Sequence, residues 1–198
     1  MDGQLSFDEP PVPADPKKNV REKSGCGKSV SRKITITAVL SALLITGKYA
    51  IQFIPWIEVV TIFVIVFTCV FGWRMTAAAV NIFCALDPII YPATMSFPSI
   101  IAGYFIFWNL LCGLSHLLFR LRLRRSVVWA FFALIMTALF DVIMTAANFV
   151  MTGAPFIPLY ISGVIFNWPR YITNFSVLLL LYNPLRTFLT KLNNSYMR

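Results

Sequence analysis

Five charged residues lie within or beside long apolar stretches of this 198-residue chain: Lys48, Glu58, Asp87, Asp141 and Arg170. An ionised side chain at the centre of a membrane helix costs about 2.5–3.5 kcal/mol on insertion scales. Residues kept at such a cost usually bind a polar solute, carry protons or pair with one another. The sequence therefore makes all five candidates for binding a polar ligand.

Asparagines recur at helical spacing from two of these charges. Asn148 follows Asp141 by seven residues, and Asn167 and Asn174 flank Arg170 at i−3 and i+4. Residues three, four or seven apart share one face of a helix. The spacing predicts two polar stripes, and we expect both to face a cavity in which Arg170 and its asparagines lie opposite Asp141 and Lys48.

Two aromatic residues, Trp56 and Tyr91, complete the set of candidate ligand-binding residues. Each lies near the end of an apolar segment, at about the level of the charged residues. Aromatic rings at that level can stack on a flat ligand. Tyr and Trp also form the ordinary aromatic belt at a membrane interface, so both interpretations stay open.

A structural role for the charged residues is the alternative to ligand binding. Two ion pairs are conceivable from the sequence, Asp141 with Lys48 or Asp87 with Arg170. Such pairs would neutralise the charges within the bilayer without any ligand. The spacing alone does not decide between a binding site and these pairings.

No catalytic or metal-binding set accompanies these residues. The single histidine, His116, lies near the opposite end of its segment, and the four cysteines lack metal-ligand spacing. The stretch 24–29, SGCGKS, resembles the end of a phosphate-binding loop. The loop requires a glycine five residues before Gly27, where this chain has Glu22, and the stretch lies in a charged tail. We expect no enzymatic activity, no bound metal and no cofactor.

Six apolar segments must position the candidate residues, and together they predict an all-α bundle of six transmembrane helices. Hydrophobic residues make up 58% of the chain and charged residues 13%, which is typical of an integral membrane protein. The segments cover residues 34–54, 57–71, 75–91, 98–119, 126–147 and 157–182. The second and third are short for a crossing of about 20 residues and could form a re-entrant hairpin instead.

The distribution of positive charge predicts the orientation of the bundle. With six crossings, every Lys and Arg except Lys48 and Arg170 falls on one side, which the positive-inside rule makes cytoplasmic. Both termini are then cytoplasmic: a disordered tail at 1–33, a membrane domain at 34–192 and a short tail at 193–198. The net charge of +9 therefore indicates membrane topology, and we expect no nucleic-acid partner.

Across residues 34–192 the chain resembles the substrate-binding S component of energy-coupling factor (ECF) transporters. Segment 1 carries Ala38 and Ala42, which are similar to the small-residue stripe of those subunits. Segment 2 ends at Phe71-Gly72-x-Arg74, like the glycine turn of the family. Segment 6 reads Phe-Asn-x-x-Arg-x-x-x-Asn over 166–174, similar to a family pattern in which an acid and a His replace Asn167 and Arg170.

The resemblance implies a subunit in a bacterial cell membrane that binds a vitamin-like molecule from the outer side. It also implies three partners, namely a transmembrane coupling subunit, which would dock on Ala38 and Ala42, and two ABC-type ATPases. Because segment 6 departs from the family pattern, the ligand is not predicted. Two alternatives remain: a stand-alone transporter with Asp141 as the proton-linked carboxylate, or an intramembrane enzyme using Asp141 or Glu58 as acid or base.

Overall fold

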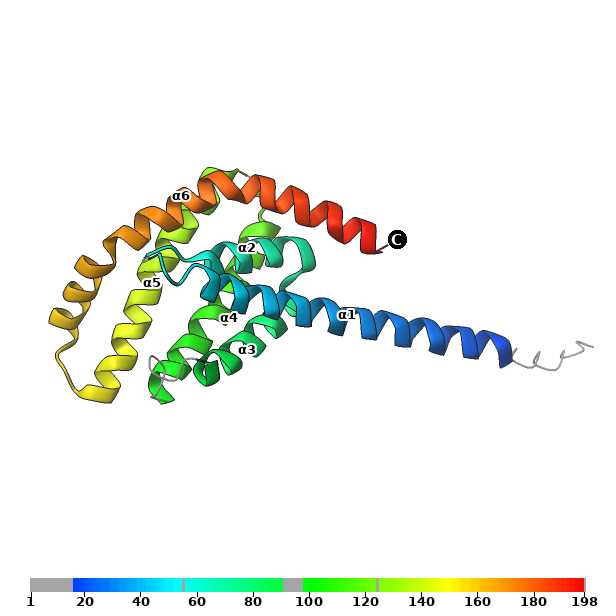
Figure 1. The fold of residues 1–198 in the computed structure, drawn as a ribbon, viewed down its shortest axis with the longest axis horizontal. Helices are drawn as coiled ribbons and strands as arrows, with labels where there is room; N and C mark the ends of the chain where they lie inside the picture. The colour runs from blue at the N-terminus through cyan, green and yellow to red at the C-terminus, as the bar shows by residue number, and fades with distance from the viewer. Residues whose placement is uncertain (1–15, 55, 91–97, 124, 198) are drawn as a thin grey trace, which may run out of the picture. The chain divides into compact units, whose positions relative to one another are not determined.

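The computed structural model describes residues 16–54, 56–90, 98–123 and 125–197, and these residues form six helices connected by short segments without a strand (Figure 1). The all-α prediction is confirmed for this part of the chain. The helices are α1 Pro16–Ala50, α2 Val59–Phe71, α3 Trp73–Ile90, α4 Pro98–Arg120, α5 Ser126–Thr152 and α6 Phe156–Met197.

Three of the helical stretches are long and apolar enough to cross a membrane: Val30–Ala50 within α1, Pro98–Arg120 and Ser126–Thr152. The α2 helix is also apolar, but it has only 13 residues. A crossing takes about 20 residues at 1.5 Å per residue. The length and composition of these helices are those of a membrane protein.

The ends of the first and last helices differ from the sequence prediction. Helix α1 begins at Pro16, although the composition predicted disorder up to residue 33, and residues 1–15 lie outside the described residues. Lys, Arg and Glu are good helix formers, so the apolar helix extends back into the charged stretch. Helix α6 continues to Met197 through Pro169 and Pro184, whereas the predicted segment ended at 182.

The chain divides into two compact units, one up to Thr35 and one from Ile36 to Arg198. The second unit has a core rich in aromatic residues. Trp129 stacks on Tyr182 with ring centroids 5.1 Å apart, and the fully buried Trp108 meets Phe83 edge-to-face at 6.0 Å. Edge-to-face and stacked pairs hold aromatic rings in defined positions, so these contacts fix the helices that carry the polar residues.

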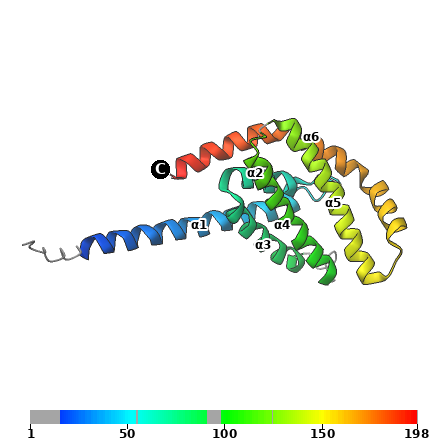
Figure 2. The same ribbon diagram turned by 180° about the vertical axis from the view of Figure 1, so that it is seen from behind.

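Two glycines lie in turns between consecutive helices, one between α2 and α3 and one between α5 and α6. Gly72, with φ +86°, connects α2 to α3 as the sequence predicted, and Gly153, with φ +66°, ends α5 while its N–H donates to the Phe149 carbonyl. Glycine adopts positive φ without the steric cost that other residues meet. The turn at Gly153 brings α6 back alongside α5, as both views of the fold show (Figures 1 and 2).

Candidate functional site

The carboxylate of Asp141 on α5 is the centre of a polar cluster with α6. It accepts hydrogen bonds from Arg170 Nη2, from the Tyr171 hydroxyl at 2.7 Å and from Asn167 Nδ2 at 3.4 Å. The Arg170 guanidinium also lies over the Phe140 ring, 4.7 Å from its centroid. Asp141 is 6% exposed and the Arg170 side chain 15%, so this is a largely buried ion pair.

The spacing predicted that Asn174 faces a cavity, but the structure buries it between α5 and α6, outside the lining of the α5–α6 pocket. It is 1% exposed, and its Nδ2 donates to Thr137 Oγ1 across the α5–α6 contact at 3.0 Å. A buried amide without such a partner would be costly. Asn174 therefore holds the two helices together, and its partner Thr137 was not identified from the sequence.

A second ion pair, with Asp87 buried and Lys48 partly exposed, connects α1 with α3. Lys48 Nζ lies 2.5 Å from Asp87 Oδ2, and the Tyr49 hydroxyl donates to Asp87 Oδ1 at 3.0 Å. Lys48 also donates to the Tyr104 hydroxyl at 3.4 Å and lies 5.7 Å from the Phe83 ring centroid. Asp87 is 1% exposed, so its negative charge is neutralised within the protein.

These contacts correct the ion pairs considered from the sequence. Lys48 pairs with Asp87 rather than Asp141, and Arg170 pairs with Asp141 rather than Asp87. The expected arrangement of Lys48 opposite the α6 stripe is likewise wrong. Spacing along a helix determines which residues share a face, but the packing of α5 on α6 decides which charges meet.

A pocket of about 520 Å³ lies between α5 and α6, next to the Asp141 cluster. Its polar lining consists of Asp141, Thr145, Asn148, Ser162 and Asn167. Its apolar lining consists of Phe140, Met144, Leu159, Gly163 and Phe166. This volume and this mixture of apolar walls with a few polar groups are typical of small-molecule sites.

The pocket unites three of the predicted ligand-binding residues, Asp141, Asn148 and Asn167. The other seven lining residues were not predicted to bind a ligand: Phe140, Met144, Thr145, Leu159, Ser162, Gly163 and Phe166. For two of them the signal was present in the spacing, since Phe140 and Met144 precede Asn148 by eight and four residues and so share its face of α5. Apolar residues on such a face are difficult to distinguish from core residues without knowing the neighbouring helix.

The other predicted residues lie outside this pocket. The backbone carbonyl of Trp56 accepts a hydrogen bond from Thr173 Oγ1 at 2.6 Å. The centroid of the Trp56 ring is 6.3 Å from that of Phe166, a pocket residue. Glu58 precedes α2 and makes no side-chain capping bond to it. Tyr91 lies outside the described residues, and Ala38 and Ala42 are exposed on α1.

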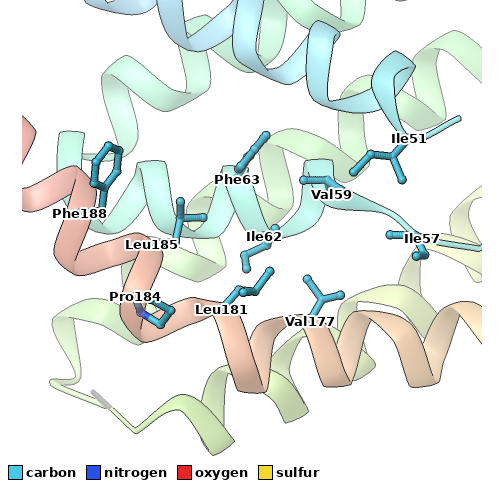
Figure 3. A pocket seen from close by; sticks show the side chains of 10 residues that line it. All are labelled: Ile51, Ile57, Val59, Ile62, Phe63, Val177, Leu181, Pro184, Leu185 and Phe188. Atoms are coloured by element: carbon cyan, nitrogen blue, oxygen red, sulfur yellow. The ribbon is translucent and has the colours of Figure 1, made fainter. Parts of the chain in front are cut away.

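A second cavity, of about 500 Å³, is lined entirely by apolar residues (Figure 3). Ile51 and Ile57 lie at one end, Ile62 and Phe63 come from α2, and α6 contributes residues from Val177 to Phe188. This second cavity offers no polar group to orient a solute. The α5–α6 pocket is therefore the better candidate site.

In the part of the chain that the structure describes, no three His, Cys, Asp or Glu side chains gather closely enough to hold a metal ion. Cys84 and Cys112 are buried, and Cys69 is half-buried with its sulfur 3.7 Å from the Tyr182 hydroxyl.

The candidate site therefore consists of the α5–α6 pocket and its neutralised charge cluster. No family model, curated protein or solved structure matches this chain.

Proposed function

We propose that this chain is the substrate-capturing membrane subunit, or S component, of an ECF-type importer. It binds a vitamin-like micronutrient from the outer side and delivers it together with a coupling subunit and two ABC-type ATPases. The observation that carries the proposal is the α5–α6 pocket, in which Asp141, Asn148 and Asn167 line a volume of about 520 Å³. The resemblance over residues 34–192 supplies the partners.

The depth of the pocket supports capture from the outside. In the proposed topology all six helices cross the membrane, and both termini are cytoplasmic. Asp141 then lies about 22 Å from the inner end of α5 at a rise of about 1.5 Å per residue. The pocket residues of α6, from Leu159 to Asn167, follow directly after the external turn at Gly153. The pocket therefore belongs to the outer half of the protein.

The surface of α1 supports docking of a coupling subunit. Ala38, Ala42, Thr46 and Ala50 follow one another at intervals of four residues, and all four are exposed. Small side chains let two membrane helices approach closely. The stripe thus extends beyond the two alanines identified from the sequence and gives a partner helix about three turns of contact at 3.6 residues per turn.

The proposed function predicts a stable complex that drives ATP-dependent uptake. When the chain is purified from its native membrane in mild detergent, we expect mass spectrometry to identify a transmembrane partner and ABC-type ATPases. In proteoliposomes, uptake by this complex should stop when ATP is withdrawn. Uptake by the isolated chain that is driven by a proton gradient without ATP would support the stand-alone transporter. Chemical conversion of the transported molecule by the isolated chain would support the alternative of an intramembrane enzyme.

The proposed topology predicts which side of the membrane each cysteine faces. In intact cells, an impermeant maleimide should label Ser96→Cys in the predicted external connection but should not label Cys26 until the membrane is permeabilised. The reason is the one-sided distribution of Lys and Arg. Labelling of Cys26 in intact cells, without labelling of Ser96→Cys, would contradict the orientation.

A further inference from the structure

The α5–α6 pocket presents polar groups but no unpaired charge. Asp141 is the single ionisable residue in its described lining, and Arg170 beside it neutralises Asp141. In the other ion pair, Lys48 and Asp87 neutralise each other. Taking this pocket as the substrate site of the proposed function, we infer that its ligand has no net charge and is recognised through amide-type hydrogen bonds.

An anionic ligand would meet no Lys or Arg side chain among the described residues that line the pocket. It would face the Asp141 carboxylate. The nearby guanidinium of Arg170 donates through Nη2 to that carboxylate and stacks on Phe140; its buried Nε has no hydrogen-bond partner, and Arg170 is not among the residues that line the pocket. To bind Arg170 through Nη2, the anion would have to displace the Asp141 carboxylate from a largely buried ion pair and leave Asp141 without its counter-ion. Removing one partner of a buried pair is strongly unfavourable.

A cationic ligand fits no better. Both oxygens of Asp141 already accept hydrogen bonds, Oδ1 from Arg170 and Asn167 and Oδ2 from Tyr171. A second cation at this carboxylate would lie beside the Arg170 guanidinium and would be repelled by it. The arrangement that excludes anions therefore disfavours cations as well.

The asparagines are the amide groups of the pocket lining, to which Thr145 and Ser162 add hydroxyls. Asn148 uses its Nδ2 for the Met144 carbonyl at 3.0 Å, and Asn167 uses its Nδ2 for Asp141. A side-chain amide has an acceptor oxygen in addition to its two donor hydrogens. The side-chain oxygens of both asparagines are therefore acceptors for a ligand donor. With Phe140 and Phe166 as walls, the pocket suits a ring-containing molecule that carries amide-like donors and acceptors.

Fractionated small molecules test this inference. A small-molecule cell extract is separated by ion exchange into neutral, anionic and cationic fractions, and each is added to the purified full-length protein during thermal unfolding. We expect only the neutral fraction to raise the unfolding temperature. In Asn167→Leu the concentration of this fraction needed for the same shift should rise about tenfold, as expected for one lost hydrogen bond of roughly 1.4 kcal/mol.

The matched control is Asn81→Leu, which removes an amide on α3, whereas the pocket is lined by α5 and α6. It should respond like the wild type. Asn148→Leu replaces Asn167→Leu if the latter does not fold. Stabilisation by a charged fraction that is lost in the pocket variant would overturn the inference but leave the proposed function standing. Equal responses of the wild type and the pocket variant to every fraction would overturn the pocket as the substrate site and the inference with it.

Discussion

Arg170→Ala is expected to destabilise the protein by about 3–5 kcal/mol, the usual cost of removing one partner from a buried ion pair. The substitution leaves the Asp141 carboxylate, which is 6% exposed, with only the Tyr171 hydroxyl and the Asn167 amide as donors. Thermal unfolding of the ligand-free protein in detergent would measure the loss. The double variant Arg170→Ala/Asp141→Ala should recover most of it, because no uncompensated charge remains.

A matched control lies on the same helix. Arg186 stacks on the rings of Phe119 and Tyr182, with its Cζ 5.4 and 5.9 Å from their centroids, and no carboxylate pairs with it among the described residues. Arg186→Ala should therefore cost less than Arg170→Ala, because it leaves no buried charge behind.

An opposite result for Arg170→Ala would change the assignment of the site. If the variant unfolded at the wild-type temperature but lost ligand affinity, the guanidinium would be a ligand contact, and the inference of an uncharged ligand would be wrong. If stability fell and neutralising Asp141 did not restore it, the contact of Arg170 with Phe140 would dominate over the ion pair.

The double substitution Ala38→Trp/Ala42→Trp is expected to reduce uptake to background and to prevent assembly with the coupling subunit. Two indole rings would keep a partner helix from the close approach that small residues allow. Both positions are exposed on α1, so the variant should fold, and its affinity for ligand should be unchanged. Co-purification, proteoliposome uptake and ligand binding would be measured on the same preparation.

The adjacent face of α1 provides the control. Val39 and Leu43 have the same four-residue spacing and are also exposed, and Val39→Trp/Leu43→Trp adds similar rings to this neighbouring face. This variant should assemble and transport like the wild type. Normal uptake by the Ala38/Ala42 variant would show either that the coupling subunit docks elsewhere or that the chain is not an S component.

The sequence predicted the helices well because an apolar run and its interruptions are local properties. The expected segment at 98–119 corresponds to Pro98–Arg120, and the one at 57–71 to Val59–Phe71. The turn at Gly72 was also predictable, since glycine is favoured where φ is positive. The C-terminal end of α6 was less predictable: the expected segment ended at 182, whereas the helix continues through Pro184 to Met197.

The polar stripes were local properties too, but their partners were not. The three-residue spacing of Asn167 and Arg170 determined that they share one face of a helix, and the structure places both at Asp141. Only the packing of α5 on α6, and of α1 on α3, decided that Asp141 meets Arg170 and that Lys48 meets Asp87. Helical periodicity is a property of a single segment, whereas the choice of counter-ion depends on which segments become neighbours in space.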